Sequence, residues 1–186
     1  MKKKTNKIIF FLEAIVLIGG LGWFLVTNVS LPETTQERSV AATIFPIFDI
    51  TENIAGNMIP VHLILEPGAS PHTFDPTPST LRALSNTDVI YAIGHGFDNW
   101  IDPLIQTTGG KKYLVDDGIL LRESTDDHKE GHDDDHHHGA VDPHYWLDIE
   151  NAKRIAQTIA QDLASRFPNY AGGFETNLEN YLEELD

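Results

Sequence analysis

Between residues 40 and 115, short apolar runs alternate with stretches whose apolar residues recur every three or four positions. The apolar runs predict strands, and the helical spacing predicts helices between them. Strands are expected at residues 40–45, 61–65, 88–93 and 112–115, and helices at 46–57, 80–86 and 97–108. This alternation, with short links and Ser79 as N-cap of the second helix, predicts an α/β fold with a parallel sheet flanked by helices.

Residues 118–139 interrupt the pattern, and helical spacing then returns. Asp148 is a suitable N-cap for a helix over residues 149–167, which Pro168 ends. Its predicted buried face consists of Ile149, Ala152, Ala156, Ile159 and Leu163. A last helix is expected from about Ala171.

The first thirty residues differ from the rest of the chain. Four lysines, at positions 2, 3, 4 and 7, precede an apolar run over residues 8–29. A helix of this length measures about 33 Å, enough to cross a hydrocarbon core of about 30 Å. We expect a signal or transmembrane anchor at residues 1–30, which would insert into the membrane through residues 8–29 and leave residues 31–186 outside the cytoplasm. A cleaved signal peptide is the alternative, and residues 31–39 are expected to form a linker.

Charge and cysteine content narrow the function. The chain has 28 acidic and 13 basic residues, and its net charge of −15 disfavours nucleic acid and favours cations. It has no cysteine, so disulfides, thiolate zinc sites, cysteine nucleophiles and lipid attachment through an N-terminal cysteine are excluded. It also lacks His-Glu-x-x-His, Gly-x-Ser-x-Gly and a phosphate-binding Gly-rich loop, and we therefore expect no enzyme activity.

The nine histidines are unevenly placed, and five of them share residues 126–138 with six acidic residues. Nothing in that tract can pack into a core, so residues 118–139 are expected to form a mobile loop. Imidazole favours zinc and its neighbours among the transition metals. The candidate auxiliary zinc ligands are His128, His132, His136, His137 and His138. A solvated acidic linker without a metal role is the alternative.

Two further histidines are candidate primary ligands. His72 lies just beyond the carboxyl end of the second predicted strand, where open α/β sheets bind ligands, and nearby prolines restrict its backbone. His144 lies before the helix that Asp148 caps, and either Asp142 or Asp148 could fix its tautomer. Each histidine alone could be a loop residue bonded to backbone. Together, in a cysteine-free chain with a histidine-rich tract, they indicate a metal site.

Other candidates carry less weight. His95, between Gly94 and Gly96, is expected to have a surface or helix-start role, and His62 is expected at the surface of its strand. The aromatic residues expected in the core or at the wall of a cleft are Phe45, Phe97, Trp100 and Trp146.

The segments around His72 and His144 resemble the extracytoplasmic metal-binding subunits of ABC importers, the zinc and manganese solute-binding proteins that are also grouped with lipoprotein adhesins. The resemblance covers residues 40–186. It is carried by residues 40–48, 67–79, 88–98, 142–147 and 177–186, and by the histidine-rich tract that separates the two histidine motifs.

The resemblance implies a protein of two α/β lobes with a metal ion clamped between them. Residues 40–167 would then form the N-terminal metal-binding lobe, and residues 168–186 would begin the helix that joins the lobes. His72 and His144 match the family's first two metal ligands. A further histidine and a carboxylate would come from the second lobe, which this sequence does not include.

Residues and resemblance together predict an extracytoplasmic subunit, in the periplasm or at the cell surface, that captures Zn²⁺ and delivers it to an ABC permease in the membrane. The histidine-rich tract resembles the zinc-handling branch of the family. One alternative is a manganese (Mn²⁺) or iron subunit of the same fold. Another is a surface adhesin in which the metal is structural.

Overall fold

The computed structural model describes residues 38–124 and 141–186. A four-stranded parallel sheet runs through it in the order β2-β1-β3-β4. The strands are β1 (Ser39–Ala42), β2 (Val61–Leu63), β3 (Thr87–Ala92) and β4 (Lys111–Leu114). The α-helices are α2 (Phe45–Ala55), α3 (Pro78–Ala83), α4 (Ile101–Thr108), α5 (Ile149–Arg166) and α6 (Ala171–Glu184), with 3₁₀ turns η1 (Tyr145–Leu147) and η2 (Pro168–Tyr170). The predicted α/β class, with a parallel sheet flanked by helices, is confirmed.

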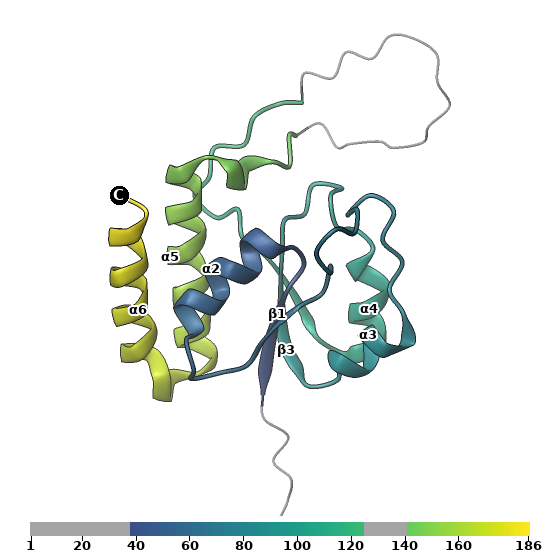
Figure 1. Ribbon diagram of the computed structural model, residues 1–186, viewed down its shortest axis with the longest axis horizontal. Coiled ribbons are helices and arrows are strands. Elements are labelled where there is room, and N and C mark those ends of the chain that lie inside the picture. The colour runs from purple at the N-terminus through teal and green to yellow at the C-terminus, as the bar shows by residue number, and fades with distance from the viewer. Residues whose placement is uncertain (1–37, 125–140) are drawn as a thin grey trace, which may run out of the picture. The chain divides into compact units, whose positions relative to one another are not determined.

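The central strands alternate their side chains between two apolar cores. Val40 and Ala42 of β1 belong to the core formed with α2, α5 and α6, whereas Ala41 belongs to the core formed with α4. All three are fully buried, as expected for a parallel sheet that helices cover on both faces. Figure 1 shows α2, α5 and α6 on one side of the sheet and α3 and α4 on the other.

One face of α5 docks this helix on the sheet and on α2. Ile155, Ile159 and Leu163 recur every four residues, and each is fully buried. Burying a side chain of this size contributes about 1.5–3 kcal/mol, so these three dominate the docking energy of the helix. The predicted face is correct for Ala156, Ile159 and Leu163 but wrong for Ile149, which is 49% exposed at the first helical position.

Helix α3 begins earlier than predicted. Its N-cap is Thr77 rather than Ser79, because the Thr77 hydroxyl accepts a hydrogen bond from the backbone N–H of Thr80 and the Thr80 hydroxyl accepts one from the Thr77 N–H. Pro78 then occupies the first helical position, where a missing N–H costs no hydrogen bond.

Phe45 was predicted in the core or at a cleft wall, and it does not lie in the core. Its side chain is 56% exposed at the first position of α2, because the residues of this helix that face the core are Ile47, Ile50 and Ile54. The helical period therefore turns Phe45 outward.

The buried carboxylate of Asp98 joins three segments at the carboxyl edge of the sheet. The residue is only 1% exposed. Its Oδ2 accepts hydrogen bonds from the Thr43 hydroxyl and from the Ile93 N–H, both at 2.8 Å, and its Oδ1 accepts one from the Gly94 N–H at 2.9 Å. These bonds hold the chain in turns after β3, so α4 begins at Ile101 and not at residue 97 as predicted.

None of the helices in residues 38–124 and 141–186 is long and apolar enough to cross a membrane. The predicted transmembrane span at residues 8–29 lies outside the described residues, as do most of the predicted linker at 31–39 and most of the predicted mobile loop at 118–139.

We expect Asp98→Asn to lower the free energy of unfolding by about 2–3 kcal/mol. An amide has one acceptor oxygen, so at least one of the three donors would face an N–H₂ group and lose its buried partner. Urea unfolding measures the change. Asp102→Asn, on the exposed side of α4, is the control and should cost less than about 1 kcal/mol, the usual value of a surface ion pair. Equal losses in the two variants would contradict the role given to Asp98.

Candidate metal centre

His72 lies in the loop that connects the carboxyl end of β2 to α3, and its side chain is exposed. Its backbone N–H donates to the Ser70 hydroxyl at 3.3 Å. Its ring meets the ring of Phe97 almost at right angles, with centroids 5.6 Å apart and planes at 74°. The loop between β2 and α3 therefore places this imidazole near the end of β3.

His144 belongs to the segment that precedes α5, and this segment also lies at the carboxyl edge of the sheet. An antiparallel bridge pairs Val141 with Glu123, and the Asp142 N–H donates to the Arg122 carbonyl at 2.9 Å. The next residue after His144 begins η1, whose Tyr145 is buried and donates its hydroxyl hydrogen to the Ile93 carbonyl at 3.0 Å. This bond ties the His144 segment to the end of β3.

The two imidazoles meet on Phe97. The His144 ring lies 5.7 Å from the Phe97 ring at 83°, similar to the 5.6 Å and 74° of the His72 ring. The two imidazole centroids are therefore at most about 11 Å apart, the sum of the two distances. Trp146 completes the cluster, with its ring 5.0 Å from Phe97 and 5.2 Å from His144. The structure thus brings together two histidines that stand 72 positions apart in the sequence.

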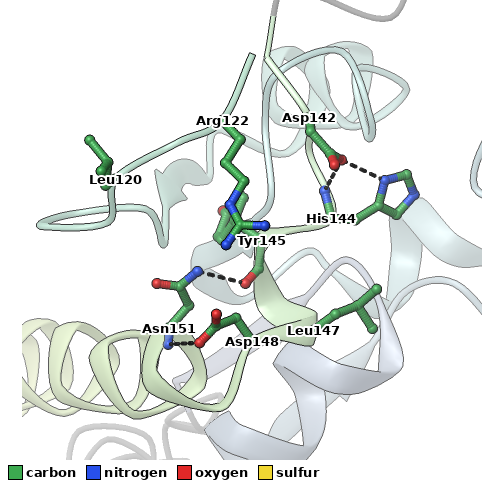
Figure 2. Close-up of a pocket in the computed structure, with 8 residues that line it drawn as sticks. All are labelled: Leu120, Arg122, Asp142, His144, Tyr145, Leu147, Asp148 and Asn151. Atoms are coloured by element: carbon green, nitrogen blue, oxygen red, sulfur yellow. Dashed lines mark hydrogen bonds and ion pairs between the residues drawn. The ribbon is translucent and has the colours of Figure 1, made fainter. Parts of the chain in front are cut away.

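Asp142 orients the His144 ring. One carboxylate oxygen, Oδ1, accepts the backbone N–H of His144 at 3.0 Å and lies 2.8 Å from its Nδ1 (Figure 2). Since a carboxylate only accepts hydrogen bonds, we assign the ring proton to Nδ1. That tautomer leaves the Nε2 lone pair available for a metal ion. Of the two aspartates predicted as candidates for this role, Asp142 makes the contact.

Asp148 has a different function. Its carboxylate accepts hydrogen bonds from the backbone N–H groups of Glu150 and Asn151, which makes it the predicted N-cap of α5. The Asn151 amide in turn donates to the Tyr145 carbonyl at 3.0 Å. The start of α5 and the His144 segment therefore support each other.

Hydrogen bonds and burial shift two pKa values at this edge. The backbone N–H of His144, and then its ring, hold the pKa of Asp142 below its ordinary value of 3.8. Burial, and then the negative charges of Asp116 and Asp98, raise the pKa of Tyr145. Asp142 is therefore an anion, and Tyr145 a neutral donor, over the whole pH range in which imidazole is neutral.

A cavity of about 350 Å³ opens beside His144. Figure 2 shows the imidazole and the Asp142 carboxylate facing each other at its edge, with Leu120 and Arg122 coming from the segment after β4. The other lining residues are Tyr145, Leu147, Asp148 and Asn151. The cavity leaves one side of the His144 segment open to solvent.

The other two histidines of the described residues, His62 and His95, have different surroundings. The His95 Nε2 is 2.8 Å from an Asp116 carboxylate oxygen, and the ring packs edge-on against Tyr145 at 6.2 Å. His95 begins no helix, because α4 starts six residues later. His62 is half-buried in β2, so it is less exposed than predicted.

Within residues 38–124 and 141–186, no group of three or more His, Cys, Asp or Glu side chains has the geometry to hold a metal ion. The described site therefore presents two imidazoles. The predicted auxiliary ligands His128, His132, His136, His137 and His138 lie outside the described residues.

Sequence reasoning missed the residues that support the two histidines. Phe97 was expected only in the core or at a cleft wall, and Asp98 and Tyr145 were not singled out. Gly94-His95-Gly96 marks a special turn, but no spacing rule tells which side chains such a turn presents.

Comparison with known proteins identifies relatives of the whole described lobe. The sequence model of a family described as "Zinc-uptake complex component A periplasmic" matches residues 40–186. The manganese ABC transporter substrate-binding lipoprotein PsaA of Streptococcus pneumoniae is 33% identical over 194 aligned positions, which cover 100% of this chain and 59% of the relative. The manganese-binding lipoprotein MntA of Halalkalibacterium halodurans is 34% identical over 74% of this chain and 42% of its own length. The chain thus spans less than two thirds of these relatives.

Solved structures share the fold. Zn(II)-bound AdcA of Streptococcus pneumoniae superposes with a TM-score of 0.66 over 80% of this chain and 30% of that one, at 22% identity. A Mn-bound periplasmic metal-binding protein of Candidatus Liberibacter asiaticus has the same TM-score over 80% of this chain and 53% of its own, at 25% identity. The relatives are named as substrate-binding proteins of transporters rather than as enzymes, which agrees with the absence of enzyme motifs.

We expect His144→Ala to raise the pKa of Asp142 towards 3.8, because the ring hydrogen bond disappears while the backbone one remains. A carbon-13 NMR titration of the carboxyl group measures this shift. Since folding lowers this pKa, the contact stabilises the folded state above about pH 4, and its contribution is lost as the pH falls through the lowered value. His95→Ala should leave the Asp142 pKa unchanged. An equal Asp142 pKa in wild type and His144→Ala would rule out the assigned ring contact.

Proposed function

The chain belongs to the zinc-uptake complex component A family, and on this premise we propose that it captures a divalent metal ion outside the cytoplasm and delivers it to an ABC permease in the membrane. The observation that carries the proposal is the meeting of His72 and His144 on Phe97 at the carboxyl edge of a parallel sheet. This edge is where open α/β sheets bind ligands.

His72 and His144 are the proposed ligands. Both side chains are exposed, so each can approach an ion without unfolding a core. Asp142 sets the tautomer of His144 and increases its basicity, as carboxylates commonly do for metal-binding histidines. Trp146 and Phe97 shield one side of the ring from water. These contacts support the proposal that the histidine pair binds a cation.

Two imidazoles do not complete a metal site. Structural zinc sites usually have four protein ligands, and water alone in the remaining positions gives weaker binding. Relatives named as metal-binding proteins are longer than this chain, and we propose that the remaining ligands come from outside the described residues. The family resemblance implies a histidine and a carboxylate for this role.

Zinc is the proposed cargo, with manganese as the alternative. Neutral imidazole binds zinc more tightly than manganese, and the tract at residues 126–138 adds five histidines that we propose to act as an auxiliary zinc-binding segment. The manganese alternative is favoured by the printed names of PsaA and MntA, two relatives at 33% and 34% identity.

We propose that residues 1–30 attach the chain to the outer side of the membrane. PsaA and MntA are named as lipoproteins, whereas this chain has no cysteine to carry a lipid. The lysines at 2, 3, 4 and 7, followed by the apolar run at 8–29, provide a different attachment.

We expect His72→Ala and His144→Ala each to weaken zinc binding at least tenfold, because each removes one of the two proposed protein ligands. Competition with a chromophoric chelator at pH 7.5 measures the affinity, and the same assay at pH 5 should show weaker binding by wild type, since protonated imidazole cannot ligate. His62→Ala, at a histidine of β2 that is not a proposed ligand, is the matched control. Unchanged affinity in both ligand variants would refute the assignment.

We expect deletion of residues 126–138 to reduce the number of zinc ions bound per chain while leaving the tightest site within about threefold of wild type. The deletion removes five imidazoles but neither His72 nor His144. Titration with Zn²⁺ and with Mn²⁺, followed by metal analysis of the protein, gives both the stoichiometry and the preference. If the deleted chain binds Mn²⁺ more tightly than Zn²⁺ at the histidine pair, manganese is the cargo.

A further inference from the structure

Phe97 is a buried aromatic residue that touches three other rings. It is 5% exposed, and the His72, His144 and Trp146 rings all lie within 5.7 Å of its centroid, at interplanar angles of 65–83°. Near-perpendicular packing is attractive because the positive edge of one ring meets the negative face of another. The preferred orientation of each histidine ring therefore depends on where Phe97 lies.

The backbone that carries Phe97 is held on both sides. Its own N–H donates to the Gly94 carbonyl at 3.0 Å, and the next residue, Asp98, accepts three hydrogen bonds from two segments of the edge. A flexible loop would not present an aromatic ring in one fixed place. These bonds make Phe97 a rigid reference point.

The turn before Phe97 adopts a conformation that favours glycine at three successive positions. Gly94, His95 and Gly96 have φ values of 76°, 54° and 87°. His95 is the only non-glycine residue with positive φ in residues 38–124 and 141–186, and its contact with Asp116 helps to hold it there. Strain of this kind persists where the surrounding structure enforces it, and such places cluster at functional sites.

We propose that Phe97 is a positioning residue that sets the orientation of both His72 and His144 for metal binding. The proposal rests on the function proposed above, in which these two histidines are the ligands. A phenyl ring has no atom that ligates a metal, so Phe97 acts only through the imidazoles. Packing against it restricts ring rotation before the ion arrives, and a ligand that is already ordered loses less entropy on binding.

The test compares variants that keep or remove the aromatic ring. Phe97→Leu keeps an apolar side chain and removes the ring, Phe97→Tyr keeps the ring, and Phe174→Leu removes an equally buried aromatic side chain from α6. Zinc affinity should fall about tenfold in Phe97→Leu and stay within about threefold of wild type in the other two. If Phe97→Leu does not fold, Phe97→Met, of similar volume, replaces it.

Double-mutant cycles separate positioning from general destabilisation. If Phe97 acts through the ligands, its loss and the loss of either histidine should not be additive: His72→Ala and His144→Ala should each cost less in the Phe97→Leu background than in wild type. Phe174→Leu should be additive with both. Additive costs at Phe97, or equal affinity losses in Phe97→Leu and Phe174→Leu, would overturn the proposal.

A measurement on the metal-free protein distinguishes failure of this proposal from failure of the proposed function. Carbon-13 relaxation of the ring Cε1–H groups reports how restricted the His72 and His144 rings are. Phe97→Leu should loosen both rings and Phe97→Tyr neither, whatever the protein binds. If the two histidine rings are as restricted in Phe97→Leu as in wild type, the positioning role is wrong. If His72→Ala and His144→Ala both bind zinc as tightly as wild type, the proposed function is wrong instead.

Discussion

The hydrogen bonds of one buried carboxylate hold together the edge on which the candidate site lies. Asp98 accepts two backbone N–H groups from the end of β3 and one hydroxyl from the residue after β1. A buried anion is costly unless hydrogen bonds satisfy its oxygens, and three donors at 2.8–2.9 Å do so here. The turn that follows β3 can adopt few other conformations that keep all three hydrogen bonds. These bonds therefore fix the position of Phe97, and with it the place where the two histidines meet.

The two proposed ligands are presented by different local means. His72 lies in a loop whose prolines restrict the backbone conformation, and its ring packs against Phe97. His144 is held by short polar contacts, with Asp142 at its Nδ1 and the bond from Tyr145 to the Ile93 carbonyl behind it. Both arrangements reduce the freedom that metal binding would otherwise have to remove. The two imidazole rings are held separately, and their shared contact with Phe97 is what makes them a pair.

Much of the fold follows from local patterns, and the support of the site does not. Four apolar runs and the helical periods between them suffice for the parallel sheet and its helices, because burial on both faces leaves an unbroken apolar signal. The N-cap of α5 at Asp148 was predicted correctly, since capping depends on neighbouring residues. The start of α4 was not, because the bonds that delay it run from Asp98 to Thr43, fifty-five positions earlier. Likewise, the spacing of His72 and His144 indicates a site, whereas the aromatic ring between them depends on tertiary contacts.

The charge of the chain and the exposure of the two histidines are consistent with the proposed capture and release of an ion. The net charge of −15 over the full sequence raises the local concentration of cations, while the two imidazoles are exposed at the edge of the sheet. A closed site with four protein ligands, as in structural zinc centres, would retain its ion and become part of the fold. The Asp98 hydrogen bonds and the two apolar cores include neither His72 nor His144. In the function proposed above, the ion can therefore leave its two imidazoles without unfolding the sheet, as a protein that carries metal as cargo requires.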